Sequence, residues 1–105
     1  MKMHRHSADT LIKQTRNDLF DAIATIQTAE EAKLFLKDLC TPTEIQAMTD
    51  RWLVVSAIKA EKPYRQIYDE TGVSVTTVGR VARCIMLGDG GYNLIFDRLK
   101  KNRKK

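Results

Sequence analysis

The stretch YRQIYDETGVSVTTVGRVARCIM, residues 64–86, decides the fold of this chain. A short helical pattern ends at Thr71-Gly72, and a second helix begins directly behind Ser74. Gly72 suits the left-handed conformation that ends a helix, and Ser74 is a favourable N-cap for the helix that follows. Two short helices joined by so tight a turn cross at a steep angle, so the stretch predicts a helix-turn-helix motif.

The apolar residues of this stretch fall where two crossed helices would bury them. Ile67 precedes the turn and Val73 lies within it, and Val78 and Val81 follow. One position departs from many such motifs, which carry a small residue four places before the turn glycine, because this chain has Tyr68 there. The alternative for this segment is an ordinary corner between two helices of a bundle.

The opposite face of the second helix carries short side chains and two arginines, and no carboxylate occurs between Thr71 and Gly88. Short hydroxyl and methyl groups suit close contact with base edges, and guanidinium groups suit phosphates or guanine. We therefore expect this face to bind double-stranded DNA in the major groove. Its residues are Val75, Thr76, Thr77, Gly79, Arg80 and Arg83.

The length and composition of the chain predict a single all-α domain over residues 1–105. Hydrophobic residues make up 43% of the chain, there are only 2 prolines and 5 glycines, and no strand-like alternation occurs. No apolar run approaches the roughly 20 residues that span a bilayer, and the polar start lacks the apolar segment of a signal peptide. We therefore expect a cytoplasmic protein that does not contact membranes.

Chemical motifs are absent from the sequence. Cys40 and Cys84 stand alone within helical patterns, which favours reduced, packed thiols. His4 and His6 belong to residues 1–8, where we expect a mobile arm and not a metal site. No nucleophile elbow, HExxH, CxxC, GxGxxG or Walker lysine is present, so we expect neither an enzyme nor a cofactor.

The positive charge lies at particular places along the chain. The net charge is +5, and the tail 100–105 alone holds five basic residues, so residues 1–99 are neutral overall. Residues 17–50 carry a net charge of −5, whereas residues 1–16 and 62–87 are basic. Such polarity suits the docking of one face on a phosphate backbone, although the tail alone could equally be a solubilising end.

The apolar residues outside residues 64–86 also recur at helical spacing, so the sequence predicts about six helices in total. A long first helix is expected over residues 7–27, and Thr28 can cap a second. A third begins with the capping box Thr41-Pro42-Thr43-Glu44 and runs to about Glu61. A short last helix follows the turn at residues 88–91.

The third of these helices is apolar on more than one face. Leu53, Val54 and Ala57 widen the stripe that Ile45 and Met48 begin. A single chain of this size would leave much of that apolar surface exposed to solvent, whereas two chains paired through their N-terminal helices would bury it. A dimer would also place two recognition helices one DNA turn apart, about 34 Å, so we expect an obligate homodimer on a palindromic operator.

The order of these elements is similar to that of the tryptophan-repressor superfamily, in particular its YerC/YecD branch. The resemblance covers residues 36–99 and rests on the Thr41-Pro42 helix start, Arg51, Arg80 and the ending LGDGGY at residues 87–92. It implies an intertwined dimer of six helices per chain that binds operator DNA and represses transcription. It also implies roles at the DNA, with Val75, Thr76, Thr77 and Gly79 facing bases and Tyr64, Arg65 and Tyr68 near the backbone.

The resemblance bears on an effector as well. In the tryptophan-binding members an indole lies between two arginines, and the matching positions are Arg51 and Arg80, with Thr41 matching a residue that helps to hold the ligand's amino group from the other chain. Val81 stands where those members have a glycine that leaves room for the ring. We therefore expect either an amino-acid-like effector other than tryptophan or DNA binding without one. For Arg80 we rank a phosphate contact above effector binding, and the role of Arg51 stays open.

Two classes of function fit these patterns. The first is a sequence-specific transcriptional repressor, and the alternative is a non-enzymatic helical interaction module or a general nucleic-acid-binding protein. They differ in selectivity, because a specific repressor prefers its operator over random DNA by about 10³-fold or more, whereas a general binder loses affinity with salt for every sequence alike.

Overall fold

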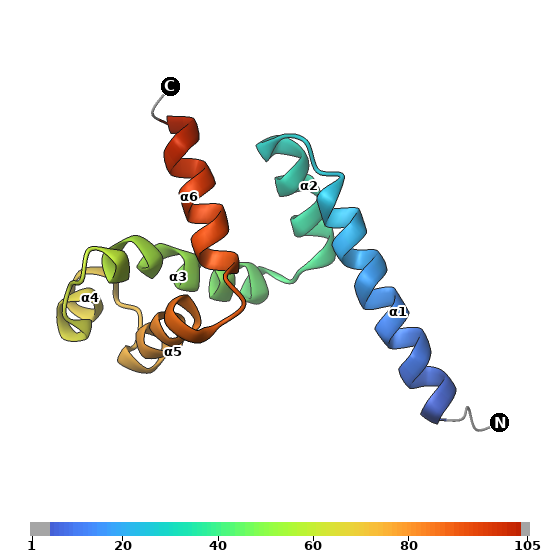
Figure 1. The fold of residues 1–105 in the computed structure, drawn as a ribbon, viewed down its shortest axis with the longest axis horizontal. Helices are drawn as coiled ribbons and strands as arrows, with labels where there is room; N and C mark the ends of the chain where they lie inside the picture. Colours follow the sequence, from blue (N-terminus) through green and yellow to red (C-terminus); the bar gives the residue numbers. More distant parts are fainter. Residues whose placement is uncertain (1–4, 104–105) are drawn as a thin grey trace. The chain divides into compact units, whose positions relative to one another are not determined.

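The chain folds into helices joined by short connections. The computed structural model describes residues 5–103, with side chains from Ala8 to Arg103, and these residues contain six helices and no strand. They are α1 (Arg5–Ala24), α2 (Ala29–Leu39), α3 (Pro42–Lys59), α4 (Tyr64–Thr71), α5 (Val75–Leu87) and α6 (Gly91–Arg103) (Figure 1). The expected all-α class and the number of helices are therefore confirmed.

The helices form two compact units, one ending at Thr41 and the other beginning at Pro42. The first unit holds α1 and α2, in which no described side chain from Ala8 to Cys40 is buried. The second holds α3 to α6 and contains every buried side chain of the described residues. Within residues 5–103, none of the helices has the length and apolar character needed to cross a membrane.

Helix α1 differs at both ends from the sequence-based boundaries of residues 7–27. It begins at Arg5, so residues 5–8 of the expected arm are helical, while residues 1–4 with His4 lie outside the described residues. At its other end the Thr25 hydroxyl donates to the Ala22 carbonyl at 2.7 Å, and the backbone N–H of Ile26 donates to Ile23. These short-range bonds replace the next helical turn, which is why the helix ends at Ala24.

Helix α2 begins as the sequence predicts. The Thr28 hydroxyl accepts a hydrogen bond from the backbone N–H of Glu31 at 3.0 Å, which confirms Thr28 as its N-cap. The Glu31 carboxylate in turn accepts from the backbone N–H of Gln27 at 2.9 Å. Two backbone donors of the connection are thereby satisfied, and the acidic first turn favours the positive end of the helix dipole.

Helix α3 ends at Lys59, two residues earlier than expected. The backbone N–H of Glu61 donates to Ile58 at 2.9 Å, and that of Lys62 donates to Ala57 at 3.2 Å. This pair of bonds is the Schellman arrangement, and it requires a left-handed residue, a conformation that Glu61 adopts with φ of 61°. A non-glycine residue in this conformation stores backbone strain.

The core lies where α3, α4 and α5 meet. Its buried members are Val54, Val55, Ile67, Val73, Val78 and Val81, with Ile85, Tyr92 and Phe96 among the half-buried side chains packed against them. The four residues that the sequence assigned to the crossing of two helices, Ile67, Val73, Val78 and Val81, are all buried. The core therefore positions the helix-turn-helix segment rigidly on α3.

Asn93 connects α6 to α3 and α5. Its side-chain oxygen accepts a hydrogen bond from the Lys59 ammonium group of α3, and its amide nitrogen donates to the Ile85 carbonyl of α5 at 3.1 Å. The Trp52 ring of α3 is stacked with the Tyr92 ring of α6 at a centroid distance of 6.3 Å. Polar and aromatic contacts thus hold α6 against the core.

Candidate nucleic-acid interface

The turn between α4 and α5 is held by its own hydrogen bonds. Gly72 has a φ of 78°, and its backbone N–H donates to the Tyr68 carbonyl at 2.8 Å, which confirms the expected left-handed helix end. The Thr71 hydroxyl donates to the Ile67 carbonyl at 2.7 Å and accepts from the backbone N–H of Val73 at 3.0 Å. The Thr71 contacts were not expected from the sequence, and they fix the direction in which α5 leaves the turn.

Ser74 caps α5, as the sequence predicts. Its side-chain oxygen accepts from the backbone N–H of Thr77 at 3.1 Å and also lies 3.1 Å from the Thr77 hydroxyl. Thr77 is half-buried, and its hydroxyl oxygen accepts a hydrogen bond from the Ser74 hydroxyl. The side chains of Val75 and Thr76 are exposed instead, so these two residues form the accessible part of the first turn of α5.

Tyr68 does not disturb the motif, although a small residue is common at its position. Tyr68 is 45% exposed, and its backbone carbonyl accepts the hydrogen bond from the Gly72 N–H described above. The core beneath is filled by Ile67 and Val73. Since the large side chain lies at the surface, its size carries no packing penalty, and the ring is accessible on α4.

The arginines of this surface differ in their surroundings. Arg80 and Arg83 are exposed, and within residues 5–103 neither lies within salt-bridge distance of a carboxylate. Arg65 of α4 lies 3.9 Å from the Asp69 carboxylate, but both side chains are largely exposed. An exposed pair at this distance contributes little, so all three guanidinium groups are available to an anion.

Part of the expected DNA-contacting set surrounds a hollow of about 710 Å³ on α5. Its lining consists of Tyr64, Thr76, Gly79, Arg80, Arg83, Met86 and Leu87. The first five of these were expected at the DNA, whereas Arg65, Tyr68, Val75 and Thr77 lie outside the lining. Met86 and Leu87 were missed, because apolar residues at the end of a helix ordinarily indicate a core contact.

A second group on α4 surrounds Glu70. Its carboxylate accepts from the Gln66 amide and from the Lys62 ammonium, each at 2.9 Å. These two hydrogen bonds stabilise the charged form, the one from Gln66 having the larger effect, and they lower the pKa of Glu70 from its usual value of 4.5. The Glu70 carboxylate is thereby paired with one residue of α4 and one residue of the connection before it.

The three candidate effector residues belong to different parts of the chain. Arg80 lies at the hollow on α5, whereas Arg51 is half-buried on α3 and Thr41 closes the first unit. Val81, the residue that argues against tryptophan, is 1% exposed and belongs to the core. Its packing between the helices accounts for a valine at this position without a ligand.

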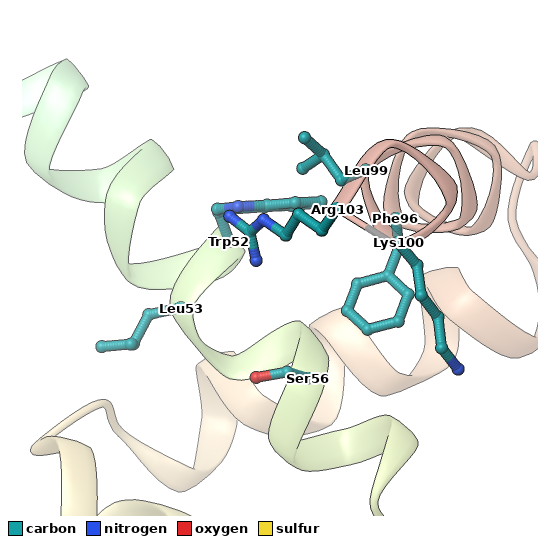
Figure 2. Close-up of a pocket in the computed structure, with 7 residues that line it drawn as sticks. All are labelled: Trp52, Leu53, Ser56, Phe96, Leu99, Lys100 and Arg103. Atoms are coloured by element: carbon teal, nitrogen blue, oxygen red, sulfur yellow. The ribbon is translucent and has the colours of Figure 1, made fainter. Parts of the chain in front are cut away.

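An apolar groove runs between α3 and α6 within the second unit. It has a volume of about 500 Å³ and is lined by Trp52, Leu53, Ser56, Phe96, Leu99, Lys100 and Arg103 (Figure 2). Trp52, Leu53 and Leu99 remain between a third and a half exposed. Lys100 and Arg103, from the expected basic tail, are in the last turn of α6 and add positive charge to the groove, while residues 104–105 lie outside the described residues.

Comparison with known proteins identifies the family of this fold. The chain is 36% identical over 93 residues to the uncharacterized protein YerC of Bacillus subtilis strain 168, covering 89% of each chain. The crystal structure of a Staphylococcus aureus protein, assigned provisionally as a Trp repressor, matches with a TM-score of 0.76 and 39% identity, covering 83% of this chain and 87% of the other. A TrpR-like protein from Eubacterium eligens ATCC 27750 matches with a TM-score of 0.77 and 34% identity, covering 88% of this chain and 95% of the other. Because the profile of the family described as Trp repressor protein also matches residues 14–100, the chain belongs to the Trp repressor family.

Proposed function

We propose that this protein is a sequence-specific DNA-binding regulator that represses transcription by binding a palindromic operator as a homodimer. The observation that carries the proposal is the exposed face of α5, which combines short side chains with Arg80 and Arg83 and has no carboxylate between Thr71 and Gly88. Membership of the Trp repressor family supports a DNA-binding regulator. We place its action in the cytoplasm and assign it no enzymatic reaction.

The two helices of the motif have different tasks in this proposal. Val75 and Thr76 are accessible on the first turn of α5, and a recognition helix reads base edges mainly through its N-terminal residues. Tyr64, Arg65 and Tyr68 are exposed on α4 and contact the phosphate backbone. The Thr77 hydroxyl accepts from the Ser74 hydroxyl and keeps its own proton, which we propose it donates to a base edge.

A second copy of the chain is the partner that we propose. Phe20 of α1 and Leu34 of α2 are about 60% exposed, and no described side chain from Ala8 to Cys40 is buried. The groove between α3 and α6 is also uncovered, and its basic rim is complementary to the net charge of −5 over residues 17–50. Burial of these apolar faces against a second copy would remove them from water, which favours an obligate dimer.

The dimer is tested by sedimentation across a wide range of protein concentrations. We expect the mass of two chains, and Leu34→Glu should lower the fraction of dimer by placing a charge on an apolar face. Lys33→Gln, at the neighbouring exposed position, changes the net charge by the same single unit and is the matched control. A monomeric mass at micromolar concentration would contradict the proposal.

We also propose an amino-acid-like effector other than tryptophan, with Thr41, Arg51 and Arg80 as the candidate contacts. Val81 supports the exclusion of tryptophan, because its side chain fills the position where the tryptophan-binding relatives have a glycine. Isothermal calorimetry with tryptophan should show no binding in the micromolar range. Micromolar binding of tryptophan would contradict this part of the proposal.

The experiment that tests DNA reading is a selection of random duplex DNA by the purified protein at about 0.15 M salt. Enrichment of a palindrome would support a dimeric repressor. If no sequence is enriched and the affinity for every DNA falls equally as the salt concentration rises, the protein is a general nucleic-acid binder. No DNA binding at all would favour an interaction module.

Two variants separate base reading from phosphate binding. Thr76→Ala removes an exposed hydroxyl from the recognition surface and should change the selected sequence. Removal of residues 100–105 deletes five positive charges and should weaken binding to all sequences about equally, with a smaller dependence on salt. If Thr76→Ala also acts uniformly on every sequence, α5 does not read bases through this residue.

A further inference from the structure

The surface residues of α5 form a single stripe that runs from its first turn to its last. This α5 stripe lies opposite the core residues Val78, Val81 and Ala82, because residues three, four and seven positions apart share one face of a helix. Its members all line the hollow on α5, and all except the half-buried Gly79 are exposed. They are Thr76, Gly79, Arg80, Arg83, Met86 and Leu87.

The stripe ends in an apolar pair. Met86 and Leu87 are 71% and 79% exposed, more than any other large apolar side chain in the described part of the chain. The backbone N–H of Gly88 donates to the Cys84 carbonyl at 2.9 Å, so the helical conformation continues through both residues. The pair is therefore held on the same regular helix as the residues expected at the DNA.

The length of the stripe can be compared with that of a DNA half-site. At a rise of 1.5 Å per residue the stripe is about 16 Å long. Base pairs follow one another at about 3.4 Å, so this length corresponds to about five base-pair steps. The major groove is about 12 Å wide and admits an α-helix. A helix lying along the groove would place its last turn, as well as its first, against base edges.

The chemistry of the pair restricts what it can contact there. Leu87 makes no hydrogen bonds, and the thioether of Met86 is only a weak acceptor, so neither side chain suits the polar edges of bases. The apolar group that the major groove displays is the C5-methyl group of thymine. Burial of these side chains against such methyl groups would remove apolar surface from water on both partners.

The charges beside the pair favour DNA as the partner. Arg80 and Arg83 lie between the two ends of the stripe, and within residues 5–103 neither has a carboxylate within salt-bridge distance. The stripe is thus positive along its middle and continuous with the first turn of α5. A duplex offers both complementary features, because its phosphates and guanines suit the arginines and its thymine methyl groups suit the apolar end.

We propose that α5 lies along the major groove and that Met86 and Leu87 contact thymine methyl groups. The pair thereby selects T·A base pairs at one end of each half-site, about five base-pair steps from the end that the first turn of α5 reads. Both residues are specificity-determining residues of the DNA-binding surface. The inference rests on the proposed function, because it names residues that decide which operator is bound.

Selection of random duplex DNA by variants locates the two ends. Met86→Ala combined with Leu87→Ala should remove the preference for thymine at one end of each half-site and leave the other end unchanged. Thr76→Ala should do the reverse. Leu94→Ala combined with Ile95→Ala removes a neighbouring pair of exposed apolar side chains from α6 and is the matched control, with an unchanged selected sequence. Circular dichroism checks that each variant keeps its helices.

Replacement of thymidine by deoxyuridine tests the methyl contact on the native protein, independently of any variant. The replacement removes only the methyl group, and at the end assigned to the pair it should weaken binding about fourfold for each methyl group contacted. The Met86 and Leu87 variant should bind the thymidine and deoxyuridine duplexes equally. Equal affinity of the native protein for the two duplexes would overturn the inference.

The other outcomes distinguish the inference from the function on which it rests. If the native protein enriches a palindrome but the Met86 and Leu87 variant binds every sequence more weakly by the same factor, the pair contacts the deoxyribose backbone and the inference is wrong. A lower fraction of dimer in the variant, with the selected sequence unchanged, would assign the pair to contact with a second copy and would also overturn it. Failure of the native protein to enrich any sequence would contradict the proposed function itself.

Discussion

The Tyr64 ring lies against the backbone of Gly79, and a Cβ built on this glycine would be 3.8 Å from Tyr64 Cε2. The first residue of α4 therefore packs on the middle of α5 at a position without a side chain. A separation of 3.8 Å is an ordinary van der Waals contact. The close approach of these two helices thus tolerates a methyl group.

Gly79→Ala should consequently stabilise the protein. A glycine inside a helix is less favourable than an alanine, so we expect the free energy of unfolding to rise by about 0.5–1 kcal/mol, measured by urea denaturation. The added methyl group also lies at the edge of the hollow and should alter DNA selection without loss of helix content. A fall in stability would show that the Tyr64 ring cannot adjust to it.

Thr71→Val should weaken the turn of the motif. The substitution keeps the shape of the side chain but leaves the backbone N–H of Val73 without its partner, at a cost of about 1–2 kcal/mol in unfolding free energy. Thr71→Ser retains the hydroxyl group and serves as the matched control. An unchanged free energy of unfolding in Thr71→Val would show that the hydrogen bonds of this hydroxyl group do not stabilise the turn.

Glu61 and Gly72 both have a left-handed backbone, with opposite consequences for substitution. Glu61→Gly should raise the free energy of unfolding by about 0.5–1 kcal/mol, because it removes the strain of a side chain at positive φ. Gly72→Ala should lower it by about 1 kcal/mol or more, although no atom lies within 4 Å of the added Cβ. Thermal melts of both variants distinguish two explanations. Backbone strain predicts these opposite changes in stability, whereas steric crowding alone predicts no change at either position.

The pKa of Glu70 gives a pH dependence whose sign follows from its lowered value. A carboxyl group with a lower pKa in the folded protein stabilises the fold above the unfolded value of about 4.5, and this contribution is lost as the pH falls through the folded pKa. Carbon NMR of the carboxyl group should therefore show a pKa below 4.5, and Gln66→Ala should raise it. Glu70→Gln should make stability less dependent on pH in the acid range, whereas Asp69→Asn is the control.

The link between α3 and α6 can be measured by a double-mutant cycle on Lys59 and Asn93. Asn93→Ala should cost about 1–2 kcal/mol, because it removes the acceptor of Lys59 and the donor to Ile85. Lys59→Met should cost less, since its aliphatic stem remains. A coupling energy of about 0.5 kcal/mol or more is expected for groups in contact, and strict additivity would contradict the link.

The turn of the motif was predictable because its rules are local. Gly72 and Ser74 each have a role that depends on residues no more than four positions away, and both roles are confirmed. The same locality made Thr28 predictable as an N-cap. The bond between Lys59 and Asn93 joins residues 34 positions apart, and no periodic pattern in the sequence indicates such a pair.

The candidate site was predictable only in part for a related reason. Sequence spacing shows which residues share a face of α5, and it brought Thr76, Gly79, Arg80 and Arg83 together correctly. It cannot show that Tyr64 from α4 closes one side of the hollow, since this depends on how two helices cross. Nor does an apolar side chain such as Met86 reveal from the sequence whether it is covered.

The two units should differ in how strongly the stability of their helices depends on contact with a partner. Amide protons in α4 and α5 are protected by a core within the same unit, whereas α2 contains no buried side chain. Helices of this length are marginal in water by themselves. We therefore expect amide hydrogen exchange in α2 to slow as a larger fraction of the chains pairs with a second copy that covers the apolar faces. Exchange in α5 should keep a nearly constant rate.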